Sequence, residues 1–182
     1  MDYSQLIKNW HLKAAEQDYF SKFIFEYLAF IAYLKTIKYI PADPASTFHD
    51  RDVIQKLKSD EDLKSRYLRI VDENPIIRLA WQELKLELDK KPLGNVSRNP
   101  SRVSEIEYWN CSHEKLTQKT PGEKALVCGV LHSLTDWENM VEFWYSIRNN
   151  LFHGAKDPEI ERDQMVVRIG YVTLSRFMDM FV

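Results

Sequence analysis

Apolar side chains recur at spacings of three and four along most of the chain, which is the pattern of amphipathic helices. Residues 18–40 are apolar nearly all round, so we expect this helix to be buried on most sides within a bundle. The same spacing predicts further helices over residues 3–14, 50–58, 60–71, 77–88, 120–134, 136–152 and 158–182. The chain is therefore predicted to be all-α, an up-and-down-type bundle of about five to seven helices. The helices at 20–40 and 136–152 are expected to pack against each other at its centre.

Capping residues and prolines mark where these helices begin and end. Thr120–Glu123 combines a cap residue, a proline at the first helical position and a glutamate three residues after the cap. Thr135 with Glu138 repeats this signature at the start of helix 136–152, and Ser59 with Asp62 resembles a capping box before residues 60–71. Prolines interrupt the pattern at Pro41, Pro44, Pro75 and Pro92.

Composition places the chain among ordinary globular proteins. Its 182 residues, 45% of them hydrophobic, suffice for one domain with a sizeable core, which we expect to span residues 1–182. Periodicity is lost over about residues 90–119, where we expect a long irregular loop with one helical turn near residues 104–109. The start of the chain does not resemble a signal peptide, no apolar run is long enough to span a bilayer, and two cysteines form no disulfide framework. These features predict a cytoplasmic protein.

Helix 136–152 ends in a group of polar residues that a core alone does not require. Continuing its apolar spacing by four places Arg148 near the centre of the apolar stripe, where a guanidinium is costly to bury unless it is paired. Asn149 and His153 are four residues apart and share a strip of the helix, and Gly154 is the usual residue just past a helix end. A cation, an amide and a titratable imidazole at one helix end suit phosphodiester binding and proton transfer.

A purely structural interpretation of the same residues stays open. An arginine that points inward from a helix can be a structural pivot paired to a carboxylate or to carbonyls. A histidine before a C-terminal glycine can serve only as a favourable charge at the helix end.

The stretch Tyr145–Gly154 resembles the characteristic motif of the HEPN superfamily, in which four to six residues separate an arginine from a histidine. The polar residue that often follows the arginine is present as Asn149. The aromatic helix over residues 20–33 resembles the first long helix of several HEPN families. The close match covers about a dozen residues, and the rest is a match of architecture.

The resemblance implies an α-helical bundle that forms a homodimer, with two motifs facing each other to make one composite ribonuclease site. It implies that His153 acts as general acid or base, that Arg148 binds the scissile phosphate, and that Asn149 orients the imidazole or binds the phosphate. Lys156, just beyond the motif, is expected to contact the RNA. Such proteins commonly act as toxins or defence effectors, and many are held in check by a nucleotidyltransferase-like antitoxin. No cofactor, metal ion or membrane is implied.

A net charge of −2 provides no overall basic field for nucleic acid, so RNA binding would need a local patch or an assembly.

Cys111, His113, Cys128 and His132 could form a zinc set, but they lack the tight cysteine pairs and knuckle glycines of structural zinc sites. Two alternatives to catalysis remain: a HEPN-like interaction or nucleotide-binding module, and a plain helical scaffold. The sequence leaves the RNA target, the regulator and the role of residues 90–119 undetermined.

Overall fold

The structure is a computed structural model that describes residues 2–15, 18–42, 47–93, 108–110 and 129–182. Within these residues it consists of α-helices and one π-helical segment, and it contains no β-strand, which confirms the predicted all-α fold class. The elements are α1 (Tyr3–Ala14), α2 (Tyr19–Tyr33), the π-helix η1 (Leu34–Lys38), α3 (Asp50–Lys58), α4 (Glu61–Glu73), α5 (Pro75–Lys90), α8 (Trp137–Phe152) and α9 (Glu161–Met178).

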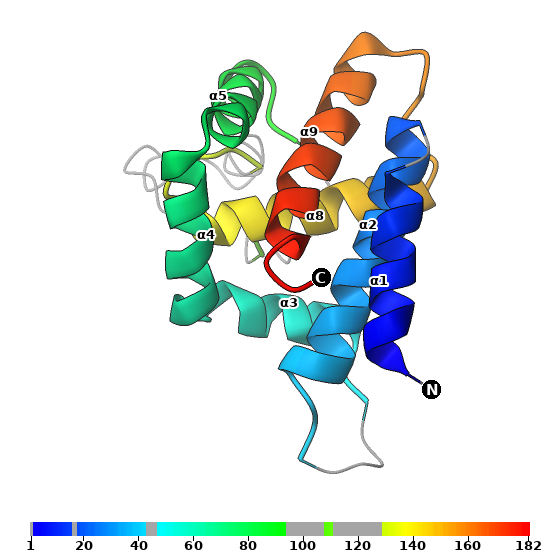
Figure 1. Cartoon of the computed structure of the whole chain (residues 1–182). Helices are drawn as coiled ribbons and strands as arrows, with labels where there is room; N and C mark the ends of the chain where they lie inside the picture. Colours follow the sequence, from blue (N-terminus) through cyan, green and yellow to red (C-terminus); the bar gives the residue numbers. More distant parts are fainter. Residues whose placement is uncertain (1, 16–17, 43–46, 94–107, 111–128) are drawn as a thin grey trace.

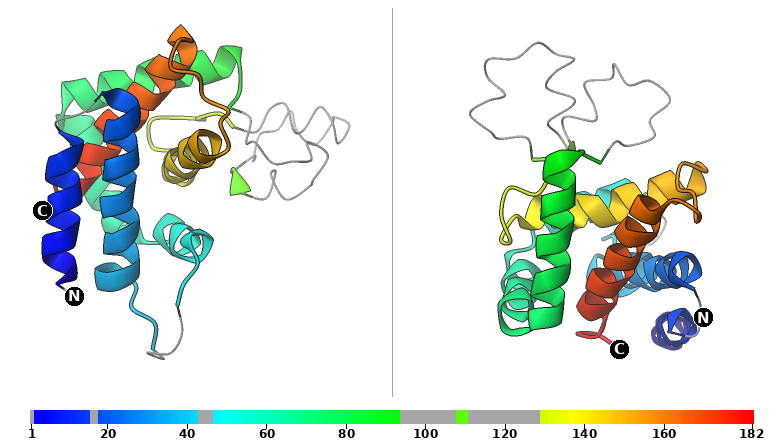
Figure 2. Two further views of the ribbon diagram at one scale, coloured as in Figure 1. Left: turned by 90° about the vertical axis from the view of Figure 1, so that its right-hand side faces the viewer. Right: turned by 90° about the horizontal axis from the view of Figure 1, so that it is seen from above.

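The helices cross one another around α8. Helices α1 and α2 run antiparallel, and α9 packs along the other part of the α2 surface (Figure 1). Helix α8 runs across α2 rather than along it (Figures 1 and 2). The predicted central packing of α2 against α8 is therefore only a crossing, and α2 makes its extensive contacts with α1 and α9. In the described parts of the chain, no helix has both the length and the apolar character needed to cross a membrane.

The fully buried Trp144 of α8 is the centre of the aromatic core. Its ring centroid lies 5.9 Å from that of Phe30 on α2, 5.5 Å from Tyr67 on α4 and 5.5 Å from Phe177 on α9. The indole N–H donates to Thr173 Oγ1 at 2.9 Å, so burial leaves this donor satisfied. One residue of α8 thus ties three other helices together and fixes the position of α8 in the molecule.

Gly170 allows α9 to approach both α2 and α8. A Cβ atom at this position would lie 2.5 Å from Ile147 Cδ1 and 3.1 Å from Phe23 Cδ2. Only a residue without a side chain fits this three-helix contact without a rearrangement of its neighbours.

Several predicted helix ends are corrected by the cap geometry. Helix α4 is capped by Asp60, whose carboxylate accepts from Leu63 N–H at 3.0 Å, and not by Ser59. Helix α8 is capped by Asp136, which accepts from Asn139 N–H, and not by Thr135. Aspartate is as good an N-cap as serine or threonine, so two adjacent candidates leave the start uncertain by one residue. The last helix begins at Glu161 rather than at residue 158.

The helix predicted over residues 120–134 is wrong where the structure describes it. Residues 129–134 form bends and turns, while the part from 120 to 128 lies outside the described residues. Gly129 adopts φ +82°, and Leu93 N–H donates to its carbonyl oxygen at 2.9 Å. A Cβ atom at Gly129 would collide with the Leu93 carbonyl oxygen. Leu131 is nevertheless fully buried. The apolar pattern of this segment therefore indicated burial correctly but not helical conformation.

Candidate functional site

The polar end of α8 is shaped by a glycine-dependent helix stop. Gly154 has φ +66°, its N–H donates to Leu151 O at 3.1 Å, and Ala155 N–H donates to Asn150 O at 2.8 Å. This pair of bonds is the Schellman arrangement, in which a left-handed residue directly follows the helix. His153 is the C-cap residue, and its side chain is exposed. The predicted end of the helix is therefore confirmed, and it places the imidazole at the surface.

The spacing predicted Arg148 in the middle of the apolar stripe. In the structure it lies instead at the edge of the core. Ile147 beside it is fully buried, whereas the Arg148 side chain is 30% exposed. Its Nη1 donates to Asn149 Oδ1 at 2.9 Å, and its Nη2 donates to Asp50 Oδ2 at 3.3 Å. The guanidinium carbon also lies 4.9 Å from the ring centroid of Phe152, which is itself 59% exposed. The guanidinium is thus held in position from two sides and still reaches solvent.

The structure brings Arg148 and Asn149 into direct contact, and His153 is not part of that pair. Among the described residues, the imidazole of His153 makes no hydrogen bond or ion pair. It is exposed one helical turn beyond Asn149, where solvent or a bound molecule can reach it. The three side chains therefore share one exposed helix end, and only the first two form a fixed pair.

Lys156 does not share this exposure. Its side chain is 6% exposed, and its Nζ pairs with Asp163 Oδ1 at 2.6 Å. Burial by itself raises the pKa of Asp163, but the hydrogen bonds from Lys156 and from Asp157 N–H outweigh it and lower that pKa below its usual value. A paired, buried ammonium anchors the chain between α8 and α9 and is not presented to a ligand at the end of α8.

The proposed zinc set falls mostly outside the described residues, which contain His132 but not Cys111, His113 or Cys128. The Nε2 atom of His132 lies 2.6 Å from the carbonyl oxygen of Asn110. The described residues contain no group of three or more His, Cys, Asp or Glu side chains that could hold a metal ion.

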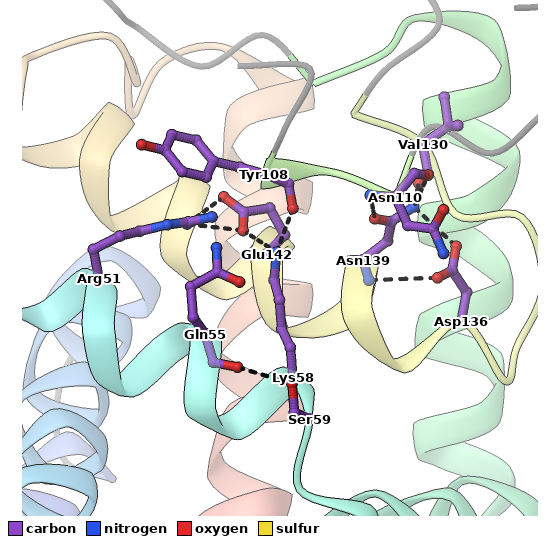
Figure 3. Close-up of polar contacts among 10 residues, drawn as sticks. All are labelled: Arg51, Gln55, Lys58, Ser59, Tyr108, Asn110, Val130, Asp136, Asn139 and Glu142. Carbon is purple, nitrogen blue, oxygen red and sulfur yellow. Dashed lines mark hydrogen bonds and ion pairs between the residues drawn. The ribbon is translucent and has the colours of Figure 1, made fainter. Parts of the chain in front are cut away.

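A second polar cluster, which the sequence interpretation missed, surrounds Glu142 in the middle of α8 (Figure 3). The carboxylate is fully buried, and both of its oxygens lie 2.8 Å from Arg51 Nη1. Lys58 Nζ pairs with the same carboxylate at 2.6 Å and also donates to the Tyr108 carbonyl. Burial lowers the pKa of the Lys58 ammonium, although the charge of Glu142 opposes that effect.

Asn139, one turn before Glu142, holds the neighbouring backbone. Its Oδ1 accepts from Asn110 N–H at 2.6 Å, and its Nδ2 donates to the carbonyl oxygens of Asn110 and Val130 at 3.0 and 2.9 Å (Figure 3). Asn139, Glu142, Ser146 and Asn150 are all buried at spacings of three and four. This polar stripe beside the apolar stripe was the available signal. Its contacts describe a structural anchor for Tyr108–Asn110 rather than an open site.

No family model matches the chain, and searches of curated proteins and of solved structures also found no match.

Proposed function

We propose that this chain is an endoribonuclease of the HEPN type whose site is formed by Arg148, Asn149 and His153. The observation that carries the proposal is the shared position of these side chains at one exposed helix end. Arg148 is held by Asn149 and Asp50, and His153 is exposed at the same helix end. A fixed guanidinium beside an exposed imidazole is suited to a reaction in which negative charge grows on phosphate oxygens while a proton moves.

In the proposed reaction, His153 takes the proton of the ribose 2′-hydroxyl or gives a proton to the departing 5′-oxygen. The 2′-oxygen attacks phosphorus and the bond to the 5′-oxygen breaks, which leaves a 2′,3′-cyclic phosphate and a 5′-hydroxyl. Arg148 offsets the charge that builds on the non-bridging oxygens. The Oδ1 atom of Asn149 positions Arg148, and its amide N–H groups remain available as donors to the phosphate.

The proposal includes a homodimer, because one chain supplies one arginine and one histidine where acid and base are both needed. Two motifs face to face would also concentrate positive charge in a chain whose net charge is −2. The biological setting would be that of a cytoplasmic toxin or defence effector, held inactive by a partner such as a nucleotidyltransferase-like antitoxin.

One observation favours a second candidate, a non-catalytic HEPN-like interaction or nucleotide-binding module. The Asp50 carboxylate already accepts a hydrogen bond from Arg148, so the cation is partly compensated before any ligand binds. In that case the motif would be a structural network at an interface.

The first test measures RNA cleavage. Purified chain in EDTA is expected to cleave single-stranded or loop RNA to products with 2′,3′-cyclic phosphate ends, and to leave DNA intact because DNA lacks the 2′-hydroxyl. His153→Ala should lower the rate by roughly 10²–10⁴, because proton transfer is lost. Arg148→Ala should lower it by roughly 10²–10³, because the phosphate charge is no longer offset.

Arg168→Ala is the matched control, because Arg168 is also a partly exposed arginine that is paired with a carboxylate, Glu83. It should cleave as the wild type does. Equal cleavage by wild type and by a folded Arg148→Ala/His153→Ala double variant would rule out this site. Absence of cleavage by wild type that is free of any copurified partner would favour the interaction module.

A further inference from the structure

Two cations from distant parts of the chain meet on one carboxylate beside the proposed site. Asp50, the first residue of α3, binds Lys35 Nζ through Oδ1 at 2.6 Å and Arg148 Nη2 through Oδ2 at 3.3 Å. The three side chains are 32%, 30% and 25% exposed for Lys35, Arg148 and Asp50. Two positive charges facing one negative charge leave this partly exposed cluster with a net charge of +1.

Lys35 reaches this cluster from a π-helical turn. Residues Leu34–Lys38 form η1, in which Tyr39 N–H donates to Leu34 O at 2.8 Å across the wider turn. Such turns are rare and are found frequently at functional sites, because they change the direction in which side chains leave a helix. The regular α-helix therefore gives way to a π-helix in the turn that contains Lys35, which pairs with Asp50 together with Arg148.

A buried hydroxyl lies next to the same cluster. The Oη atom of Tyr27 is buried and has no hydrogen-bond partner among the described residues, and the Tyr27 ring centroid is 6.0 Å from the Arg148 guanidinium carbon. Burial is the main cause that raises the pKa of Tyr27 well above its usual value, and the charge of Asp50 adds to it. Buried hydroxyls without a partner are uncommon, and this one remains a neutral donor near the cluster.

We infer that Lys35 is a second phosphate-binding cation of the site, and that Asp50 occupies in the free protein the position that an RNA phosphodiester takes on binding. Only the identity of the ligand rests on the proposed function. Carboxylate and phosphodiester oxygens are alternative acceptors for the same ammonium and guanidinium groups. Binding then exchanges one anion for another, so Lys35 and Arg148 stay paired in both states.

Binding of a non-cleavable RNA tests this inference independently of catalysis. The probe is a single-stranded 2′-O-methyl oligonucleotide, whose dissociation constant is measured at several salt concentrations. Lys35→Gln should weaken binding by about tenfold at low salt and reduce the slope of log K against log salt by about 0.7, the value of one lost phosphate contact with a single strand. Lys38→Gln is the matched control, because Lys38 lies on the same π-helix and pairs with a different carboxylate, Asp60, at 3.0 Å.

The Asp50→Asn variant tests whether Asp50 competes with the RNA phosphate for Lys35 and Arg148 or instead holds these two side chains in place for binding. If Asp50 holds the place of the phosphate, its removal should tighten binding several-fold. Weaker binding by a folded Asp50→Asn variant would overturn the competition, and an unchanged salt slope in Lys35→Gln would overturn the role of Lys35. Failure of the wild type to bind the probe would overturn both.

Cleavage and binding separate the two proposals. If the wild type cleaves RNA and the Lys35→Gln variant binds the probe as tightly as the wild type does, this inference is wrong and the proposed ribonuclease stands. A reduced salt slope in Lys35→Gln without any cleavage by wild type would remove the ribonuclease and leave an RNA-binding site. Thermal melts of all variants establish that each is folded.

Discussion

Glu142 and Glu83 form an internal comparison at the scale of single residues. Each carboxylate accepts from one arginine nitrogen with both oxygens at 2.8 Å, but Glu142 is fully buried whereas Glu83 is 47% exposed. Removing the buried anion leaves the nearly buried Lys58 ammonium and the Arg51 guanidinium without a counter-charge, which is costly. Removing the exposed anion lets Arg168 return to water.

We therefore predict that Glu142→Gln lowers the free energy of unfolding by about 3 kcal/mol, and that Glu83→Gln lowers it by less than about 1 kcal/mol. Urea unfolding of the two variants and the wild type measures both values. Equal losses would mean that burial does not set the strength of these pairs.

The single residues of the site could be predicted only where their relations are local. Arg148, Asn149, His153 and Gly154 follow one another in the chain, and their helix-end geometry was readable from spacing. The Asp50–Arg148 contact joins residues 98 positions apart, and no local pattern contains it. The missed anchoring of Glu142 by Arg51 has the same cause, because its 91-residue separation is bridged only in the folded chain.

At the scale of elements, Gly170 sets how closely α9 approaches α2 and α8. Gly170→Ala would gain up to about 1 kcal/mol of helix propensity, but its methyl group would meet Ile147 Cδ1 and the Phe23 ring. Overpacking of this kind costs more, so we predict a net loss of about 1–3 kcal/mol in the free energy of unfolding.

Ile147→Val removes the atom that the new methyl group meets first. Alone, this change should cost about 0.5–1.5 kcal/mol, but the Gly170→Ala/Ile147→Val double variant should lose less than the sum of the single losses. Denaturant unfolding of the four proteins of this cycle checks the coupling. Strictly additive losses would place the strain elsewhere.

Elements with strong local signals were predicted well, and the others show where tertiary packing decides. The predicted helix 50–58 coincides with α3, whose apolar positions and first-turn acids agree. Residues 18–40 were predicted as one regular helix, but the π-helical turn begins at Leu34, which periodicity over a few residues does not reveal. Residues 129–134 carry helix-like spacing but take their conformation from the contact of Gly129 with Leu93.

At the scale of the whole molecule, the proposed dimer requires a surface beside the motif that a second copy can cover. Phe152 is 59% exposed next to Arg148, and burying such a ring favours association. We predict that wild type sediments as a dimer at micromolar concentration. Phe152→Glu should weaken dimerisation at least about a hundredfold, because a charge is costly in a dry interface.

Leu79→Glu is the control for this experiment. Leu79 is 63% exposed, but it belongs to α5 and is far in the sequence from the Arg148–His153 motif. It should remain dimeric. A monomeric wild type, or a Phe152→Glu variant that still sediments as a dimer, would contradict a composite site at this surface.

The hydrogen bond between Leu93 and Gly129 has a consequence for how this protein can change in evolution. Because the two residues touch, the chain leaves the end of α5 and re-enters the path toward α8 at the same point. The closure entropy of such a segment grows only with the logarithm of its length, by about 0.6 kcal/mol for each doubling. Changes of length between Leu93 and Tyr108, or between Asn110 and Gly129, would therefore leave the helical frame and the end of α8 in place, whereas loss of Tyr108–Asn110 would remove contact partners of Lys58 and Asn139.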